Sequence, residues 1–167
     1  MLSEHLIEFI KLLYNGSVFL IFPAVILFYL LKDHKGLMFA AVTLAFFTFG
    51  TLTHGLIKSF DHDSYVWRYI LWAINDCLWI LIISKLASRD KTHLLQSCLG
   101  IMVVFPAPLI QLFRVIDRHF YDLSYSTYLY KAGLPLINTL VIVICYLPLF
   151  ALVISKLKSH LAAKPQM

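Results

Sequence analysis

The chain has 167 residues, of which 60% are hydrophobic and only 14% are charged, and its formal net charge is +5. So few charged residues exclude a soluble globular domain of this size and indicate a membrane protein with a single domain, residues 1–167. The basic residues lie at the ends of apolar runs rather than in one patch. This pattern favours topology signals and lipid headgroups over nucleic acid as the partner.

Five continuous apolar runs predict an all-α bundle of five transmembrane helices. A spanning helix needs roughly 20 mostly apolar residues, and the runs reach that length without the alternation of barrel strands. The predicted helices cover about residues 10–31, 37–57, 65–86, 94–116 and 132–157. The N-terminus has neither the basic region nor the cleavage site of a secretory signal, so we expect the first helix in the mature protein.

Lysine and arginine residues near the helix ends predict the orientation, because cytoplasmic connections carry an excess of them. The first connection, the third connection and the C-terminal tail lie on one side of a five-helix protein. They carry Lys32, Lys35, Lys85, Arg89, Lys91, Lys156, Lys158 and Lys164. The opposite side carries fewer. We therefore expect the N-terminus outside, the C-terminus in the cytoplasm and the inner (plasma) membrane of a bacterium as the location.

Polar residues inside the apolar runs predict a ligand or ion pocket. Asn75 and Asp76 lie near the middle of 65–86, and a carboxylate at that depth costs about 2.5–3.5 kcal/mol on insertion scales. With the predicted orientation, the other polar residues of the spans gather in the outer half. The predicted pocket comprises Asp76, Asn75, His54, Arg68, Trp72, Gln111 and Asn138. Arg68, Trp72 and Asn75 share one stripe of their helix at 100° per residue.

On the helix predicted over 37–57, one side carries Thr43, Phe47, Thr51, His54 and Lys58. If this side faces the stripe on 65–86, we expect His54 or Arg68 to be the partner of Asp76. Each polar residue also has a structural interpretation. Single amides often join membrane helices by hydrogen bonds of about 0.6 kcal/mol. Arg68, near a helix end, is placed to extend its charged group to the interface.

Two further segments bear on the architecture. Pro106 and Pro108 interrupt 94–116 and predict a break or sharp bend there, because proline lacks the backbone donor that a helix needs. The connection 117–131 is the longest and is rich in tyrosine, which is typical of a segment at the level of the lipid headgroups. We therefore expect an interfacial anchor over 117–131 and a kinked fourth helix.

The sequence does not predict a metal or a cofactor. Asp61, His62 and Asp63 are consecutive and favour a solvated turn over a metal site, since three such side chains converge only in a special turn. His54 is the only histidine well inside an apolar run, so a bis-histidine haem would need a second ligand at the interface. Catalytic signatures such as G-x-S-x-G and H-E-x-x-H are absent from the sequence.

Three function classes remain open, and the lack of a catalytic signature favours a non-enzymatic one. The first is an accessory protein whose outward-facing pocket binds a hydrophobic or amphipathic ligand, or a membrane partner. The second is a small proton- or cation-coupled transporter or channel subunit using Asp76. The third is a haem- or quinone-linked membrane redox subunit, or a lipid-modifying enzyme, using His54 and Asp76. The expected contacts are the lipid bilayer and either a membrane-protein partner or a second copy of the chain, without nucleic acid.

Overall fold

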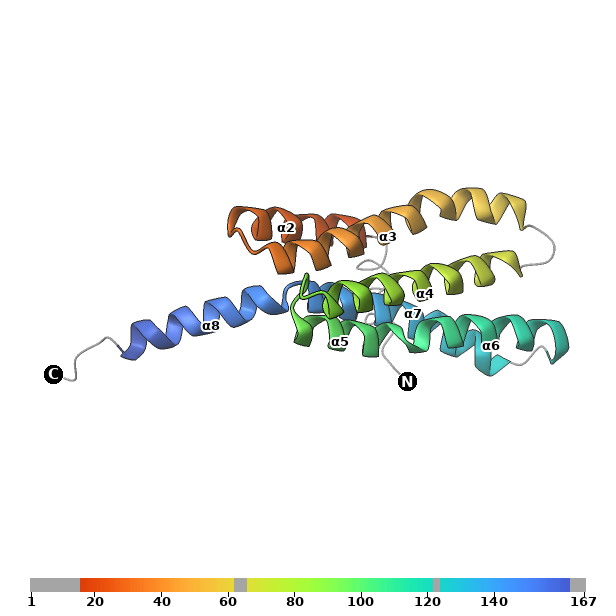
Figure 1. Cartoon of the computed structure of the whole chain (residues 1–167). Helices are drawn as coiled ribbons and strands as arrows, with labels where there is room; N and C mark the ends of the chain where they lie inside the picture. The colour runs from red at the N-terminus through yellow and green to blue at the C-terminus, as the bar shows by residue number, and fades with distance from the viewer. Residues whose placement is uncertain (1–15, 62–65, 122–123, 163–167) are drawn as a thin grey trace.

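The computed structural model describes residues 16–61, 66–121 and 124–162, and this part of the chain is entirely α-helical (Figure 1). Its helices are α2 (Ser17–Leu30), α3 (His34–Phe60), α4 (Trp67–Ser88), α5 (Leu94–Val104), α6 (Pro106–Phe120), α7 (Ser124–Cys145) and α8 (Leu147–Ala162). Within the described residues they form five rods, because α6 continues α5 and α8 continues α7. The all-α prediction is confirmed.

Four stretches of the described chain are long and apolar enough to cross a membrane. They are His34–Ile57, Trp67–Ser88, Leu94–Arg118 and Ser126–Ser155. The predicted first span, 10–31, is represented by α2, an apolar helix of 14 residues. The beginning of that prediction, 10–15, lies outside the described residues. A membrane span at 10–31, which would bring the number of spans from four to five, therefore stays a prediction.

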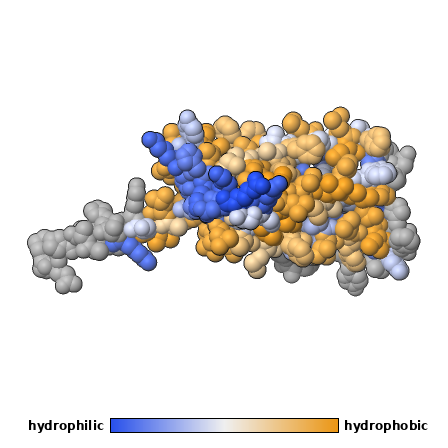
Figure 2. Space-filling view, viewed as in Figure 1, coloured by the Kyte–Doolittle hydropathy of each residue, from blue (hydrophilic) through white to orange (hydrophobic). Residues whose placement is uncertain are grey.

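Apolar side chains cover most of the face of the bundle that Figure 2 shows, apart from a band of hydrophilic side chains across part of it. Phe19 is 81% exposed, Leu52 is 72% exposed and Leu81 is 64% exposed. Exposing large apolar side chains to water on this scale would be strongly unfavourable. A lipid environment removes that cost. The protein is therefore a multi-pass membrane protein whose described helices contact the bilayer.

The two ends of the bundle differ, and we name them by one residue each. The Asp33 end holds the connections 31–33 and 89–93, where Lys35 Nζ lies 2.5 Å from Asp90 Oδ1. The Asp61 end holds the end of α3, the start of α4, the end of α6 and the start of α7. The connections whose basic residues predict the cytoplasmic side thus share the Asp33 end.

Asp33 begins α3 and links it to α5. Its side chain accepts a hydrogen bond from the Gly36 N–H at 3.1 Å, as an N-cap residue does. His93 Nε2 lies 2.9 Å from the other carboxylate oxygen. Burial works to raise the pKa of Asp33, but the bonds from His93 and Gly36 outweigh burial, so the pKa lies below its usual value. This pair joins two connections that are far apart in the sequence.

The predicted break in 94–116 lies at Phe105, between α5 and α6. Pro106 occupies the first position of α6, where a missing N–H costs little. Pro23 and Pro135, by contrast, lie inside α2 and α7 without ending them.

A second break, at Tyr146, separates α7 from α8. It leaves a backbone carbonyl without its usual helical donor, and a buried glutamine donates to that carbonyl instead. Pro148 has no N–H to give to the carbonyl four residues earlier, that of Ile144. Gln96 of α5 donates instead, with Nε2 3.1 Å from the Ile144 carbonyl and 3.2 Å from the Cys145 carbonyl. This contact joins α5 to the end of α7, where the helix itself has no N–H to offer the Ile144 carbonyl.

The predicted long connection over 117–131 is wrong. α6 runs to Phe120 and α7 begins at Ser124, eight residues before the predicted start at 132. Polar groups at the helix ends explain the extension: Arg114 Nη1 lies 3.0 Å from Asp117 Oδ2 and 2.5 Å from Ser126 Oγ, and Ser126 also bonds Asp117. Because these buried groups satisfy one another, the helices continue beyond the apolar run.

Large side chains close the bundle between the pocket level and the Asp33 end. Trp79 packs edge-on against Phe39 with ring centroids 5.7 Å apart, and its Nε1 donates to Thr43 Oγ1 at 3.3 Å. Gly100 lets α5 approach this pair, because a Cβ there would lie 3.0 Å from Phe39 and 3.1 Å from Trp79. Ile83 and Phe28 are fully buried nearby in the same core.

Candidate functional site

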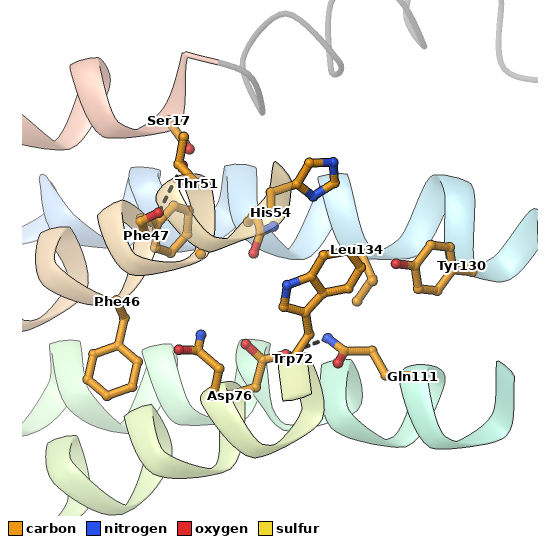
Figure 3. A pocket seen from close by; sticks show the side chains of 13 residues that line it. Ser17, Phe46, Phe47, Thr51, His54, Trp72, Asp76, Gln111, Tyr130 and Leu134 are labelled. Atoms are coloured by element: carbon orange, nitrogen blue, oxygen red, sulfur yellow. Dashed lines mark hydrogen bonds between the residues drawn. The ribbon is translucent and has the colours of Figure 1, made fainter. Parts of the chain in front are cut away.

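A cavity of about 240 Å³ lies between the helices, lined by α2, α3, α4, α6 and α7 (Figure 3). Six of the seven predicted pocket residues line it: Asp76, Asn75, His54, Trp72, Gln111 and Asn138. They lie on four helices, α3, α4, α6 and α7, and are far apart in the sequence. The seventh, Arg68, does not line the cavity.

Asp76 is bonded to a residue that the sequence did not suggest as its partner. Gln111 Nε2 donates to Asp76 Oδ2 at 2.7 Å, joining α6 to α4. The Asp76 side chain is half-buried, whereas Gln111 is only 3% exposed. The Oε1 atom of Gln111 is buried without a hydrogen-bond partner among the described residues. The pair therefore offers the Asp76 carboxylate as an acceptor at the cavity.

His54 lies on the opposite wall and contacts tryptophan rather than the carboxylate in this structure. Its ring stacks on Trp72 with centroids 5.4 Å apart and planes 4° from parallel. His54 is exposed and Trp72 is half-buried. In Figure 3 the Trp72 indole rises from α4 towards His54 and Leu134. The stacked pair thus bridges α3 and α4 along the side of the cavity.

Arg68 belongs to a different group at the Asp61 end. Its Nη2 lies 3.3 Å from the Tyr69 hydroxyl and its guanidinium is 4.9 Å from the centre of that ring. Arg118 Nη1 lies 3.5 Å from the same hydroxyl. Arg68 is also two turns from Asp76 on α4, a separation that the side chains do not span directly. The structure therefore separates Arg68 from the predicted pocket.

The remaining lining residues were not predicted as site residues, and part of the signal was present in the sequence. Tyr130, Leu134 and Asn138 repeat every four residues and line the cavity together. That spacing places them on one helix face. Tyr130 escaped because it was assigned to the connection 117–131. Phe46, Phe47 and Thr51 complete the wall on α3, and Phe47 and Thr51 lie on the stripe that contains His54.

Asp76 lies where the large cavity meets a second, much smaller one. The second cavity is about 20 Å³, the space of a single water molecule, and it shares Asp76, Asn75 and Asn138 with the first. Trp79, Val104 and Val141 form its other wall, and all three are buried core residues. On the Trp79 side of Asp76, this second cavity therefore has space for a molecule no larger than water.

The acidic turn after α3 has a structural role in its described part. Asp61 is 2% exposed and accepts bonds from the N–H groups of Val66 and Arg68, both at 3.2 Å, at the start of α4. His62 and Asp63, which complete the metal alternative, lie outside the described residues. Within residues 16–61, 66–121 and 124–162, no three His, Cys, Asp or Glu side chains are grouped as metal ligands would be.

The fold and the cavity together define the class: a small, multi-pass, α-helical membrane protein with a polar cavity among its helices. Comparisons with models of protein families, with curated proteins and with solved structures found no match to this chain. The residues themselves therefore carry the functional argument.

Proposed function

We propose that this protein binds an amphipathic ligand in the cavity and acts in an accessory, non-enzymatic role. The observation that carries the proposal is the convergence of six predicted polar and aromatic residues on one cavity. Ligand pockets typically combine a mostly apolar wall with a few convergent polar groups. Here Phe46, Phe47 and Leu134 supply apolar surface. The hydrogen-bonded pair of Asp76 and Gln111 supplies the polar group.

The size of the cavity supports an amphipathic ligand over a large rigid one. Pockets for drug-sized ligands occupy roughly 300–1,000 Å³, and this cavity is about 240 Å³. It suits the polar group of a ligand and the first part of its apolar chain. The rest of that chain would then lie against the apolar side chains that face lipid.

A photoreactive probe tests the proposal. A long-chain alcohol carrying a diazirine, added to the purified protein in nanodiscs, is expected to label Phe46, Phe47 or Leu134, as mapped by mass spectrometry. Gly50→Phe should abolish this labelling, because Gly50 lines the cavity and has no atom within 4 Å of an added Cβ. Gly55→Phe is the matched control, since Gly55 has the same free space and does not line the cavity. Labelling confined to lipid-facing residues would refute the proposal.

We further propose that the cavity opens to the outside of a bacterial plasma membrane, with the N-terminus outside. The clustering of Lys32, Lys35, Arg89 and Lys91 at the Asp33 end supports this orientation under the positive-inside rule. Thr51→Cys, in a chain with Cys77 and Cys98 replaced by serine, should react with an impermeant maleimide added to intact cells. Reaction only after the membrane is permeabilised would reverse the orientation.

A transporter or channel subunit that uses Asp76 is the second candidate, favoured by the position of Asp76 between the two cavities. Transport would require the packed Trp79, Val104 and Val141 layer to open, so binding is the simpler role. Solute or proton uptake by proteoliposomes that Asp76→Asn abolishes would establish transport. The redox alternative has less support, because His54 is the only histidine among the described lining residues and it stacks on Trp72.

A further inference from the structure

The charge of the cavity wall is one-sided. Among the described lining residues, Asp76 is the only carboxyl group and there is no lysine or arginine; the imidazole of His54 stacks on Trp72 and does not bond Asp76. The one hydrogen bond that the described residues give to this carboxylate comes from a neutral amide, that of Gln111. A carboxylate inside a membrane span is stabilised by a nearby cation or by protonation. The cavity presents the carboxylate and leaves the cation to be supplied from outside the wall.

Gln111 Oε1, the other acceptor of the pair, has no hydrogen-bond donor among the described residues. Gln111 has its Nε2 committed to Asp76, so its remaining capacity is the acceptor Oε1, which is buried without a described partner. A buried acceptor left without a bond is costly, and native structures rarely retain one. Gln111 Oε1 has almost no accessible surface, so a ligand in the cavity can donate to the Asp76 carboxylate but reaches Oε1 only if the Gln111 side chain moves.

Aromatic side chains complete the site. Phe46, Phe47 and Trp72 line the same cavity as Asp76. The faces of aromatic rings attract cations within about 6 Å, and tryptophan does so most strongly. The same rings provide apolar surface for a carbon chain. An anion would be repelled by Asp76, and a neutral hydroxyl would bond the carboxylate without neutralising its charge.

We propose that the ligand is a primary or secondary organic ammonium ion with an apolar arm. Its N–H groups donate to the Asp76 carboxylate, and its arm lies along Phe46, Phe47 and Trp72. The space is that of about eight water molecules, which fits a small amine or the amine end of a longer one. The inference rests on the proposed function, because it specifies the ligand of the same cavity.

Three probes of matched shape test the charge: 2-phenylethylammonium, 2-phenylethanol and 3-phenylpropanoate. Each is tested for protection of Thr51→Cys against a maleimide, in purified protein with Cys77 and Cys98 replaced by serine. The ammonium ion is expected to protect at a concentration about 10- to 100-fold lower than the alcohol, the range for hydrogen bonds to a charged group. The carboxylate is expected not to protect. Ser59→Cys, exposed on the same helix away from the cavity, should react at an unchanged rate.

Two variants separate charge from folding. Asp76→Asn keeps an oxygen that can accept from Gln111, and it should reduce the preference for the ammonium ion over the alcohol to less than about threefold. Asp90→Asn makes the same change at an exposed residue of the Asp33 end and should preserve the full preference. Melting temperatures close to that of the parent chain show that both variants are folded.

The outcomes distinguish this inference from the proposed function. Equal protection by alcohol and ammonium, or an ammonium preference that survives Asp76→Asn, would overturn the cation and leave an amphiphile-binding cavity. Protection by sodium chloride alone would overturn it in favour of a bare metal ion. If none of the probes protects Thr51→Cys while the diazirine alcohol labels the cavity, only the ammonium inference fails. If that labelling is absent too, both fail.

Discussion

Two tryptophans on α4, seven residues apart, show how differently the two halves of the bundle are built. Trp79 is 3% exposed, packs against Phe39 and donates its N–H to Thr43. Trp72 is half-buried, stacks on an exposed histidine and lines the cavity. One helix thus supplies a sealed layer and an accessible wall. The difference indicates that the tight packing towards the Asp33 end holds the helices together while the other half leaves space between them.

The largest expected effect on stability is that of replacing Trp79, and replacing Trp72 provides the comparison. Trp79→Ala should lower the free energy of unfolding by about 3–5 kcal/mol, the usual cost of deleting a large buried aromatic side chain. Trp72→Ala should cost about 1 kcal/mol, because its site already borders empty space. Unfolding in a denaturing detergent, followed by circular dichroism, measures both. Equal losses would show that the two halves are packed alike.

The buried glutamine of the α7–α8 break gives the next effect. Gln96→Leu should cost about 1–3 kcal/mol, because it leaves the Ile144 carbonyl without a donor. Pro148→Ala restores a backbone N–H at the position that normally serves this carbonyl. The cost of Gln96→Leu should therefore shrink in the Pro148→Ala background, as a double-mutant cycle would measure. An unchanged cost would mean that Gln96 acts through packing alone.

Two glycines of α3 sharpen the contrast in packing. A Cβ on Gly36 would lie 2.5 Å from the buried Phe28 ring, whereas a Cβ on Gly55 would meet no atom within 4 Å. Gly36→Ala should destabilise the protein by about 1–3 kcal/mol through overpacking. Gly55→Ala should be neutral or slightly stabilising, since alanine favours a helix by about 1 kcal/mol. Thermal melting of the two variants in the same detergent decides between them.

The smallest expected effect is a pH dependence at the Asp33 end. Because the pKa of Asp33 is lowered in the folded protein, its contribution is complete above its ordinary value of about 3.9 and is lost as the pH falls through the folded-state pKa. The loss between pH 6 and pH 3 should be at most about 1 kcal/mol. Asp33→Asn retains a good N-cap and should lack this part of the loss. Identical melting profiles for the two chains would contradict the assignment.

Much of the fold was predictable from apolar run length alone. α3, α4 and the pair α5–α6 lie within a few residues of the predicted 37–57, 65–86 and 94–116. The break at Phe105 followed from Pro106. The start of α7 was missed because Asp117 and Ser126 look like connection residues by polarity, and only their buried contacts with Arg114 show why the helices extend.

The lining of the candidate site was predictable where a helix face repeats and unpredictable where partners come from different helices. Trp72 and Asn75 share a stripe of α4, and the structure places both at the cavity. The bond from Gln111 to Asp76 joins residues 35 positions apart. No local pattern encodes such a pair, because it depends on how α6 is set against α4. Arg68 was assigned to the pocket by its stripe, but it contacts Tyr69 near the start of α4.

The break at Tyr146 has a consequence for how the protein meets membranes of different thickness. The stretch Ser126–Ser155 has 30 residues, which would extend about 45 Å as one straight helix, against a hydrocarbon core of about 30 Å. Such hydrophobic mismatch is relieved by tilting, kinking or local deformation of the bilayer. Because α8 extends beyond the rest of the bundle (Figure 1), it can change its tilt at Tyr146 while α7 stays packed. We expect a thinner bilayer to alter the angle of α8 and to leave the cavity unchanged.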